Sequence, residues 1–127
     1  MPGLNRVQLI GRLGRDPESH STPNKKTVTH FSLAVSNQWR SGKGEVKEQT
    51  DWFNIEAWER LGEICQQYLH KGSLIYLEGR LRTDKYEDKD GETKYFTKVV
   101  VSSMQMLDKK PDEEPAGMVE EAPAEYE

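Results

Sequence analysis

Alternation of apolar and polar residues is the feature that most constrains the fold of this chain. In a β-strand successive side chains point to opposite faces, so alternation is typical of a strand with one buried face. One stretch departs from this pattern, because the apolar residues of segment 59–70 recur at the spacing of an amphipathic helix. The alternating segments are residues 5–13, 28–38, 51–58, 74–86 and 94–101, the last of which could extend to Met106. The predicted order is therefore three strands, one helix and two strands.

This order predicts an all-β domain, a five-stranded OB-fold Greek-key barrel with one helix between strands 3 and 4. Barrel closure removes free sheet edges, and this fold commonly binds oligonucleotides. We expect the domain to occupy residues 1–107. Residues 108–127 are rich in Pro, Glu, Ala and Gly. Such a composition is typical of disorder, so an acidic disordered C-terminal tail is expected.

Parity along each strand separates the side chains that face the core from those that face solvent. The turn signals are Pro23-Asn24 and Asp90-Gly91, and a loop is expected over residues 41–50. The side chains expected to face inward are Phe31, Leu33, Val35, Phe53, Ile55, Ala57, Ile75, Leu77 and Leu81, together with Leu61, Ile64, Cys65, Tyr68 and Leu69 on one face of the helix.

Charge is divided unevenly along the chain. The net charge of the whole chain is −4. Residues 108–127 hold eight acidic residues and two lysines, a net −6, whereas the remaining residues hold 16 basic and 14 acidic side chains, a net +2. A slightly basic domain with an acidic tail is compatible with a polyanionic partner.

The segment Asp51–Trp58 carries the strongest functional signal. Its polar face holds Trp52, Asn54, Glu56 and Trp58, and we expect this face to be open to solvent. Exposed aromatic rings stack on unpaired bases, and neighbouring cations follow the phosphates. The residues expected to form such a site are Trp52, Trp58 and Tyr86 with the cations Arg6, Arg40, Arg60, Lys71, Arg82 and Lys85.

The position of Trp39 is ambiguous from the pattern alone. Parity places it with Phe31 and Leu33, toward the core, but the strand is expected to end near Gln38. Core and surface positions are therefore equally open for this side chain.

Catalysis and metal binding find little support. The three histidines lack ligand spacing, and a single cysteine, Cys65, cannot build a zinc site or an internal disulfide. We expect a non-enzymatic protein without cofactor or metal. The chain has no apolar run long enough for a membrane helix and no apparent signal peptide, which favours the cytoplasm. An RNA-binding or primosomal OB protein and a small nuclease remain as alternatives.

Several segments resemble the bacterial single-stranded DNA-binding protein family. They are NRVQLIGRLGRDPE at 5–18, Trp39-Arg40, KEQTDW at 47–52, YLHKGS at 68–73, YLEGRLRT at 76–83 and MQML at 104–107. The resemblance implies a homotetramer that wraps single-stranded DNA without strong sequence preference during replication, recombination and repair, in the nucleoid-associated cytoplasm.

The same resemblance implies roles for individual residues. It places Trp39 among the base-stacking rings and supports Trp52 in the same role. Trp58 stands where relatives often have Phe, and Tyr86 where they often have Trp, so both keep a ring. The cations that fall at backbone-contacting positions of the family are Arg6, Arg60, Lys71, Arg82 and Lys85.

The C-terminal tail departs from the family pattern. Relatives usually end in an acidic tip capped by Ile-Pro-Phe, which docks on replication and repair enzymes. Residues 120–127 are acidic but lack this apolar cap. The difference argues against partner recruitment through the tail and fits a truncated, divergent, plasmid-borne or phage-borne member.

Overall fold

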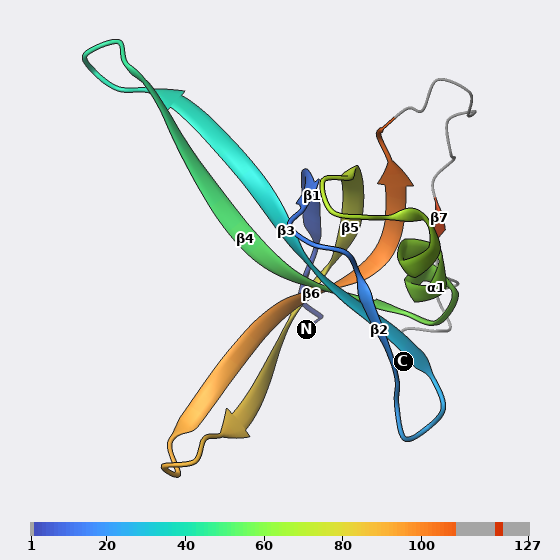
Figure 1. Ribbon diagram of the computed structural model, residues 1–127. Coiled ribbons are helices and arrows are strands. Elements are labelled where there is room, and N and C mark those ends of the chain that lie inside the picture. Colours follow the sequence, from blue (N-terminus) through green and yellow to red (C-terminus); the bar gives the residue numbers. More distant parts are fainter. Residues whose placement is uncertain (1, 109–118, 121–127) are drawn as a thin grey trace.

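A computed structural model describes residues 2–108 and 119–120 of the chain (Figure 1). Strands make up most of it, and the single helix lies between β4 and β5. The elements are β1 (Val7–Leu13), β2 (Glu18–Ser21), β3 (Thr27–Arg40), β4 (Val46–Trp58), α1 (Glu59–Tyr68), β5 (Leu74–Glu87), β6 (Thr93–Met106) and β7 (Val119–Glu120).

Five of the strands form a closed circuit. β1 pairs antiparallel with β5, β5 pairs antiparallel with β6, β6 runs parallel to β4, and β4 pairs antiparallel with β3. β3 returns to β1 at the pairs Arg12–Ala34 and Leu13–Leu33, which closes the barrel. The predicted five-stranded OB barrel is thus confirmed, with its helix between the third and fourth barrel strands. β2 is added to β3, and β7 pairs with β6 outside this circuit.

The core lies inside the barrel and under α1. Its fully buried side chains alternate along the strands as parity predicts, including Leu33, Ile55 and Leu77. From the helix, Leu61 and Cys65 complete the same cluster. Burial raises the pKa of the Cys65 thiol to about 12, so this cysteine is an unreactive core residue.

Gly79 marks an irregular point in the pairing of β5 with β6. The register of β5 against β6 shifts between Glu78 and Gly79, a β-bulge. A Cβ atom added at Gly79 would lie 2.3 Å from the carbonyl oxygen of Val100, closer than any side chain tolerates. Only glycine therefore allows the two backbones to approach at this point.

Three sequence-based expectations about local structure are wrong. β2 was missing from the prediction, because all four of its residues are exposed and show no alternation. The expected loop 41–50 is much shorter, since β4 begins at Val46 and β3 continues to Arg40. Leu81 and Tyr68 were expected to face inward, but both are exposed, Leu81 where β5 leaves the barrel and Tyr68 at the last residue of α1.

Two long hairpins extend beyond the barrel in different directions (Figure 1). One is formed by the distal parts of β3 and β4, where residues 42–50 are all exposed. The other is formed by the distal parts of β5 and β6 around Asp90-Gly91. We call them the β3–β4 arm, residues 36–50, and the β5–β6 arm, residues 82–98. The expected disorder of residues 108–127 falls outside the described residues except at Asp108 and at β7, whose two residues pair with Ser103 and Met104.

Candidate nucleic-acid interface

Trp52 lies on the outer face of β4, and its side chain is 61% exposed. Its ring packs against Gly14, where an added Cβ atom would lie 2.4 Å from the indole Cζ3 atom. The missing side chain at Gly14 lets the indole ring lie close to the backbone. A large apolar ring held in solvent by its surroundings is suited to stacking on a flat ligand.

Trp39 lies on the β3–β4 arm opposite Lys47 and is 48% exposed. Its parity is the one expected, because it shares a strand face with Leu33 and Val35. The face is buried at Leu33 and open at Trp39, since β3 continues past the barrel. The ambiguity in the sequence is thus resolved in favour of the surface. Trp39 and Trp52 lie on opposite faces of the ribbon.

Trp58 differs from these two, because it is half-buried and hydrogen bonded. Its indole Nε1–H donates to Glu56 Oε2 at 2.8 Å. Glu56 was expected on an open face but is only 3% exposed. The reason is that β6 lies beside β4 here and brings Lys98 over the carboxylate, with Lys98 Nζ 2.8 Å from Glu56 Oε1.

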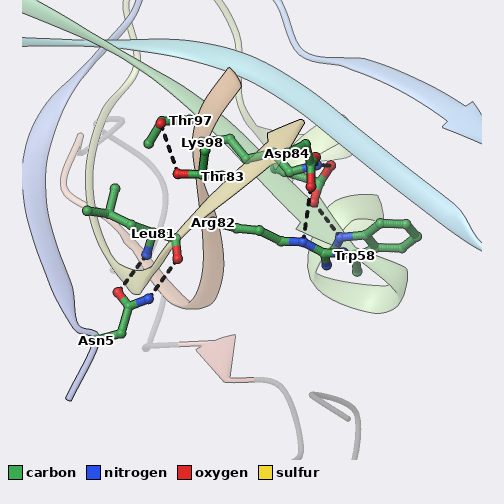
Figure 2. Close-up of polar contacts among 9 residues, drawn as sticks. Asn5, Trp58, Leu81, Arg82, Thr83, Asp84, Thr97 and Lys98 are labelled. Carbon is green, nitrogen blue, oxygen red and sulfur yellow. Dashed lines mark hydrogen bonds and ion pairs between the residues drawn. The ribbon is translucent and has the colours of Figure 1, made fainter. Parts of the chain in front are cut away.

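The polar contacts continue from Lys98 to β5 (Figure 2). Lys98 Nζ also lies 2.9 Å from Asp84 Oδ2, and Asp84 Oδ1 lies 3.4 Å from Arg82 Nε. Burial acts to lower the pKa of Lys98, but hydrogen bonds to Glu56 and Asp84 outweigh it and the pKa is raised. The hydrogen bond from Lys98 lowers the pKa of Asp84. Lys98 and Asp84 are therefore charged at neutral pH.

The β5–β6 arm carries additional aromatic side chains. Tyr86, 52% exposed, lies opposite Lys94, and Phe96 lies on the same face opposite Asp84. On the other face Lys85 lies opposite the exposed Tyr95. Sequence reasoning did not single out Phe96 or Tyr95. Pairing the two strands outward from the Asp90-Gly91 turn would have placed both rings on this arm.

The remaining predicted cations are spread over several sides of the domain. Lys71 is exposed in the turn before β5, and its backbone N–H donates to Asp16 Oδ1 at 2.8 Å, near the segment that carries Gly14. Arg60 is exposed in the first turn of α1, and Arg40 at the end of β3. Arg6 precedes β1 and is also exposed. The structure therefore brings Trp58 and Arg82 together, but it does not gather all the predicted cations into one patch.

Neither a metal cluster nor a membrane helix is evident in the part of the chain that the structure describes. Within residues 2–108 and 119–120, no three His, Cys, Asp or Glu side chains are grouped so that they could hold a metal ion. Over the same residues no helix has the length and apolar character needed to cross a membrane. The exposed chemistry consists mainly of rings and charges.

Comparison with known families decides the classification. The model of the single-strand binding protein family matches residues 4–107, which include the whole barrel. The chain belongs to the single-strand binding protein family. This member carries its exposed rings on the barrel and on both arms.

Individual relatives agree with this classification. Single-stranded DNA-binding protein 1 of Chlorobaculum tepidum is 47% identical over 109 residues, which is 85% of this chain and 67% of that protein. The single-stranded DNA-binding proteins of two Neisseria meningitidis strains, of serogroups A and B, are each 48% identical over 104 residues, or 82% of this chain. The matched region spans 60% of each Neisseria protein.

A solved structure shows the same fold. The structure described as "Plasmodium falciparum SSB complex with ssDNA" superposes with a TM-score of 0.78 at 31% sequence identity. The match covers 85% of this chain and 98% of the other.

Proposed function

We propose that this protein binds single-stranded DNA without strong sequence preference and protects it during DNA replication, recombination and repair. The observation that carries this proposal is the set of exposed rings beside cations on an OB barrel of the single-strand binding protein family. The solved relative described as a complex with single-stranded DNA supports it. In this role the protein acts in the bacterial cytoplasm at the nucleoid and carries out no chemical reaction.

The proposed mechanism uses two kinds of contact. Unpaired bases stack on Trp39, Trp52, Trp58 and Tyr86, and because every base has a π-face this contact tolerates any sequence. The phosphates meet exposed cations such as Arg40 and Lys85, and binding therefore weakens as salt rises. Duplex DNA hides its bases in the stack and offers only the second contact.

A fluorescence titration tests the proposed function. Adding a thymidine oligonucleotide should quench most of the tryptophan emission, because all three tryptophans belong to the proposed site. RNA and duplex of equal length, added as competitors, should displace the oligonucleotide less well than unlabelled single-stranded DNA. Emission that stays constant at saturating DNA would contradict the proposal, and preferential displacement by RNA would favour an RNA-binding protein.

Replacing Gly14 by alanine should weaken this binding by displacing the Trp52 ring. The new Cβ atom would overlap the indole, so the ring must move away from the backbone. We expect a loss that approaches the roughly 1–3 kcal/mol of one stacked base. Gly3→Ala is the matched control, because nothing lies within 4 Å of a Cβ atom at that position. Equal affinities of the two variants, measured by the same titration, would show that the packing against Gly14 is irrelevant.

We further propose that the protein is a homotetramer whose subunits meet over β1 and β5. Ile10 is 56% exposed on β1 and lies opposite Tyr76 on β5. Between Val7 and Gly11 the edge of β1 away from β5 pairs with no other strand among the described residues. An exposed strand edge bearing an apolar side chain is well suited to pairing with a second copy.

Light scattering at micromolar concentration should therefore give the mass of four chains. Ile10→Lys should reduce that mass, because it places a charge on the proposed contact. Val46→Lys offers a control, since Val46 is exposed on the β3–β4 arm, away from β1. A monomeric mass for the unaltered protein would refute the tetramer.

A further inference from the structure

Five side chains form a continuous polar chain across three strands (Figure 2). We call this chain the outer network, and its members in order are Trp58, Glu56, Lys98, Asp84 and Arg82. Donors and acceptors alternate along it, from the indole N–H at one end to the guanidinium at the other. The two ends are a proposed base-stacking ring and a proposed phosphate contact. The three interior members, which come from β4, β6 and β5, were not expected to take part in binding.

Lys98 is the centre of the outer network and a poor phosphate ligand in its own right. Its side chain is only 14% exposed, and its ammonium group lies within 2.9 Å of two carboxylates. Glu56 holds the indole N–H on one side of it. On the other side Asp84 engages Arg82 through the Nε atom, and the Nη groups at the far end of the guanidinium are the ones suited to a phosphate.

We propose that Glu56, Lys98 and Asp84 are positioning residues that hold the Trp58 indole and the Arg82 guanidinium as one nucleotide-binding unit. The inference rests on the proposed function and adds to it. One base stacks on the indole while a phosphate of the same strand meets Arg82. Because both ends are fixed through Lys98, binding loses less freedom than it would with two independent side chains.

Neutralising Asp84 distinguishes a positioning role from a simple effect of surface charge on DNA affinity. Glu56 and Asp84 are negative and lie near the path proposed for a polyanion. If their charge alone mattered, neutralising Asp84 would reduce repulsion and strengthen DNA binding. If Asp84 positions Arg82 and Lys98, the same change weakens binding. The two views therefore predict opposite signs for one substitution.

The decisive experiment compares Asp84→Asn with Glu87→Gln by anisotropy of a labelled thymidine oligonucleotide at low salt. Both variants remove one negative charge from β5. Glu87 is exposed and the Asp84 side chain is 44% exposed, which limits the effect on folding. Asp84→Asn should bind about tenfold more weakly, as expected when a charge-assisted hydrogen bond is lost. Glu87→Gln should bind as tightly as the unaltered protein or slightly more tightly. Thermal unfolding of each variant shows whether the barrel is intact.

A double-mutant cycle then tests whether Asp84→Asn lowers DNA affinity through Arg82. In an Arg82→Ala background Asp84→Asn should weaken binding by a clearly smaller factor, because Arg82 is gone and only the contact of Asp84 with Lys98 remains to be lost. The positioning role is overturned if Asp84→Asn binds the oligonucleotide at least as tightly as the unaltered protein. It is also overturned if Asp84→Asn lowers the affinity by the same factor with Arg82 present and with Arg82 replaced by alanine. In both cases the proposed function stands. If the unaltered protein does not bind the oligonucleotide at all, both are overturned.

Discussion

Replacing Ile55 by alanine is expected to lower the free energy of unfolding by about 2–5 kcal/mol, the range for a large-to-small change in a packed core. Ile55 is buried inside the barrel, between Phe31 on β3 and Val99 on β6 in the register of the sheet. Removing its side-chain atoms leaves a cavity that two paired strands cannot easily fill. Urea denaturation, followed by circular dichroism, measures the loss.

Trp52→Ala is the matched variant, because Trp52 lies on the other face of the same strand. Its ring is mostly in solvent, so stability should change little, whereas DNA binding should fall by roughly 1–3 kcal/mol, the contribution of one stacked base. Ile55→Ala should show the reverse, with almost unchanged affinity for the fraction that remains folded. If Trp52→Ala unfolds the domain while Ile55→Ala is harmless, the assignment of faces along β4 is wrong.

Replacing Lys98 by methionine should lower the free energy of unfolding at least as much, by about 3–5 kcal/mol, because it leaves a buried carboxylate without its charged partner. Methionine keeps most of the apolar stem of lysine, so the effect reports on the ammonium group. Glu56 is then left with the indole N–H of Trp58 and no cation within ion-pairing distance among the described residues. The same urea titration measures the change.

Two companion variants test this explanation. Lys94→Met makes the same substitution on the same strand, but Lys94 is exposed and its pairs with Asp88 and Glu92 are solvated, so the loss should stay below about 1 kcal/mol. Adding Glu56→Leu to Lys98→Met should restore much of the stability, since no buried charge then remains. A double variant less stable than Lys98→Met would contradict this account.

The barrel was predictable from sequence because each of its strands has one buried and one exposed face. Leu33, Ile55 and Leu77 lie where alternation puts them, and the change of period at residue 59 marks the helix. The exposed rings of Trp52 and Tyr86 followed from the same parity. Where a strand borders a single core, its sequence records which face is buried.

The remaining features depend on contacts that a single strand does not record. Residues of β2 and of the arms are exposed on both faces, so hydrophobicity gives no period there. Glu56 has the polarity of a surface residue, yet it is buried because Lys98, 42 residues further along the chain, covers it. Alternation fixes the direction of a side chain but does not reveal which strand will lie beside it.

Because of the two arms, the free energy of local opening differs between parts of this domain. Along residues 36–40 and 46–50 the backbone hydrogen bonds between β3 and β4 have no packed layer beneath them, so the two strands can separate here at a free energy far below that of global unfolding. Amide hydrogens of the β3–β4 arm should therefore exchange with solvent much faster than those around Leu33 and Leu77, which exchange only when the barrel unfolds. A ligand that binds the arms must restrict the opening of their strands, and the conformational entropy lost in doing so reduces its affinity. The same looseness lets each arm adapt to a flexible strand whose course differs from one molecule to the next.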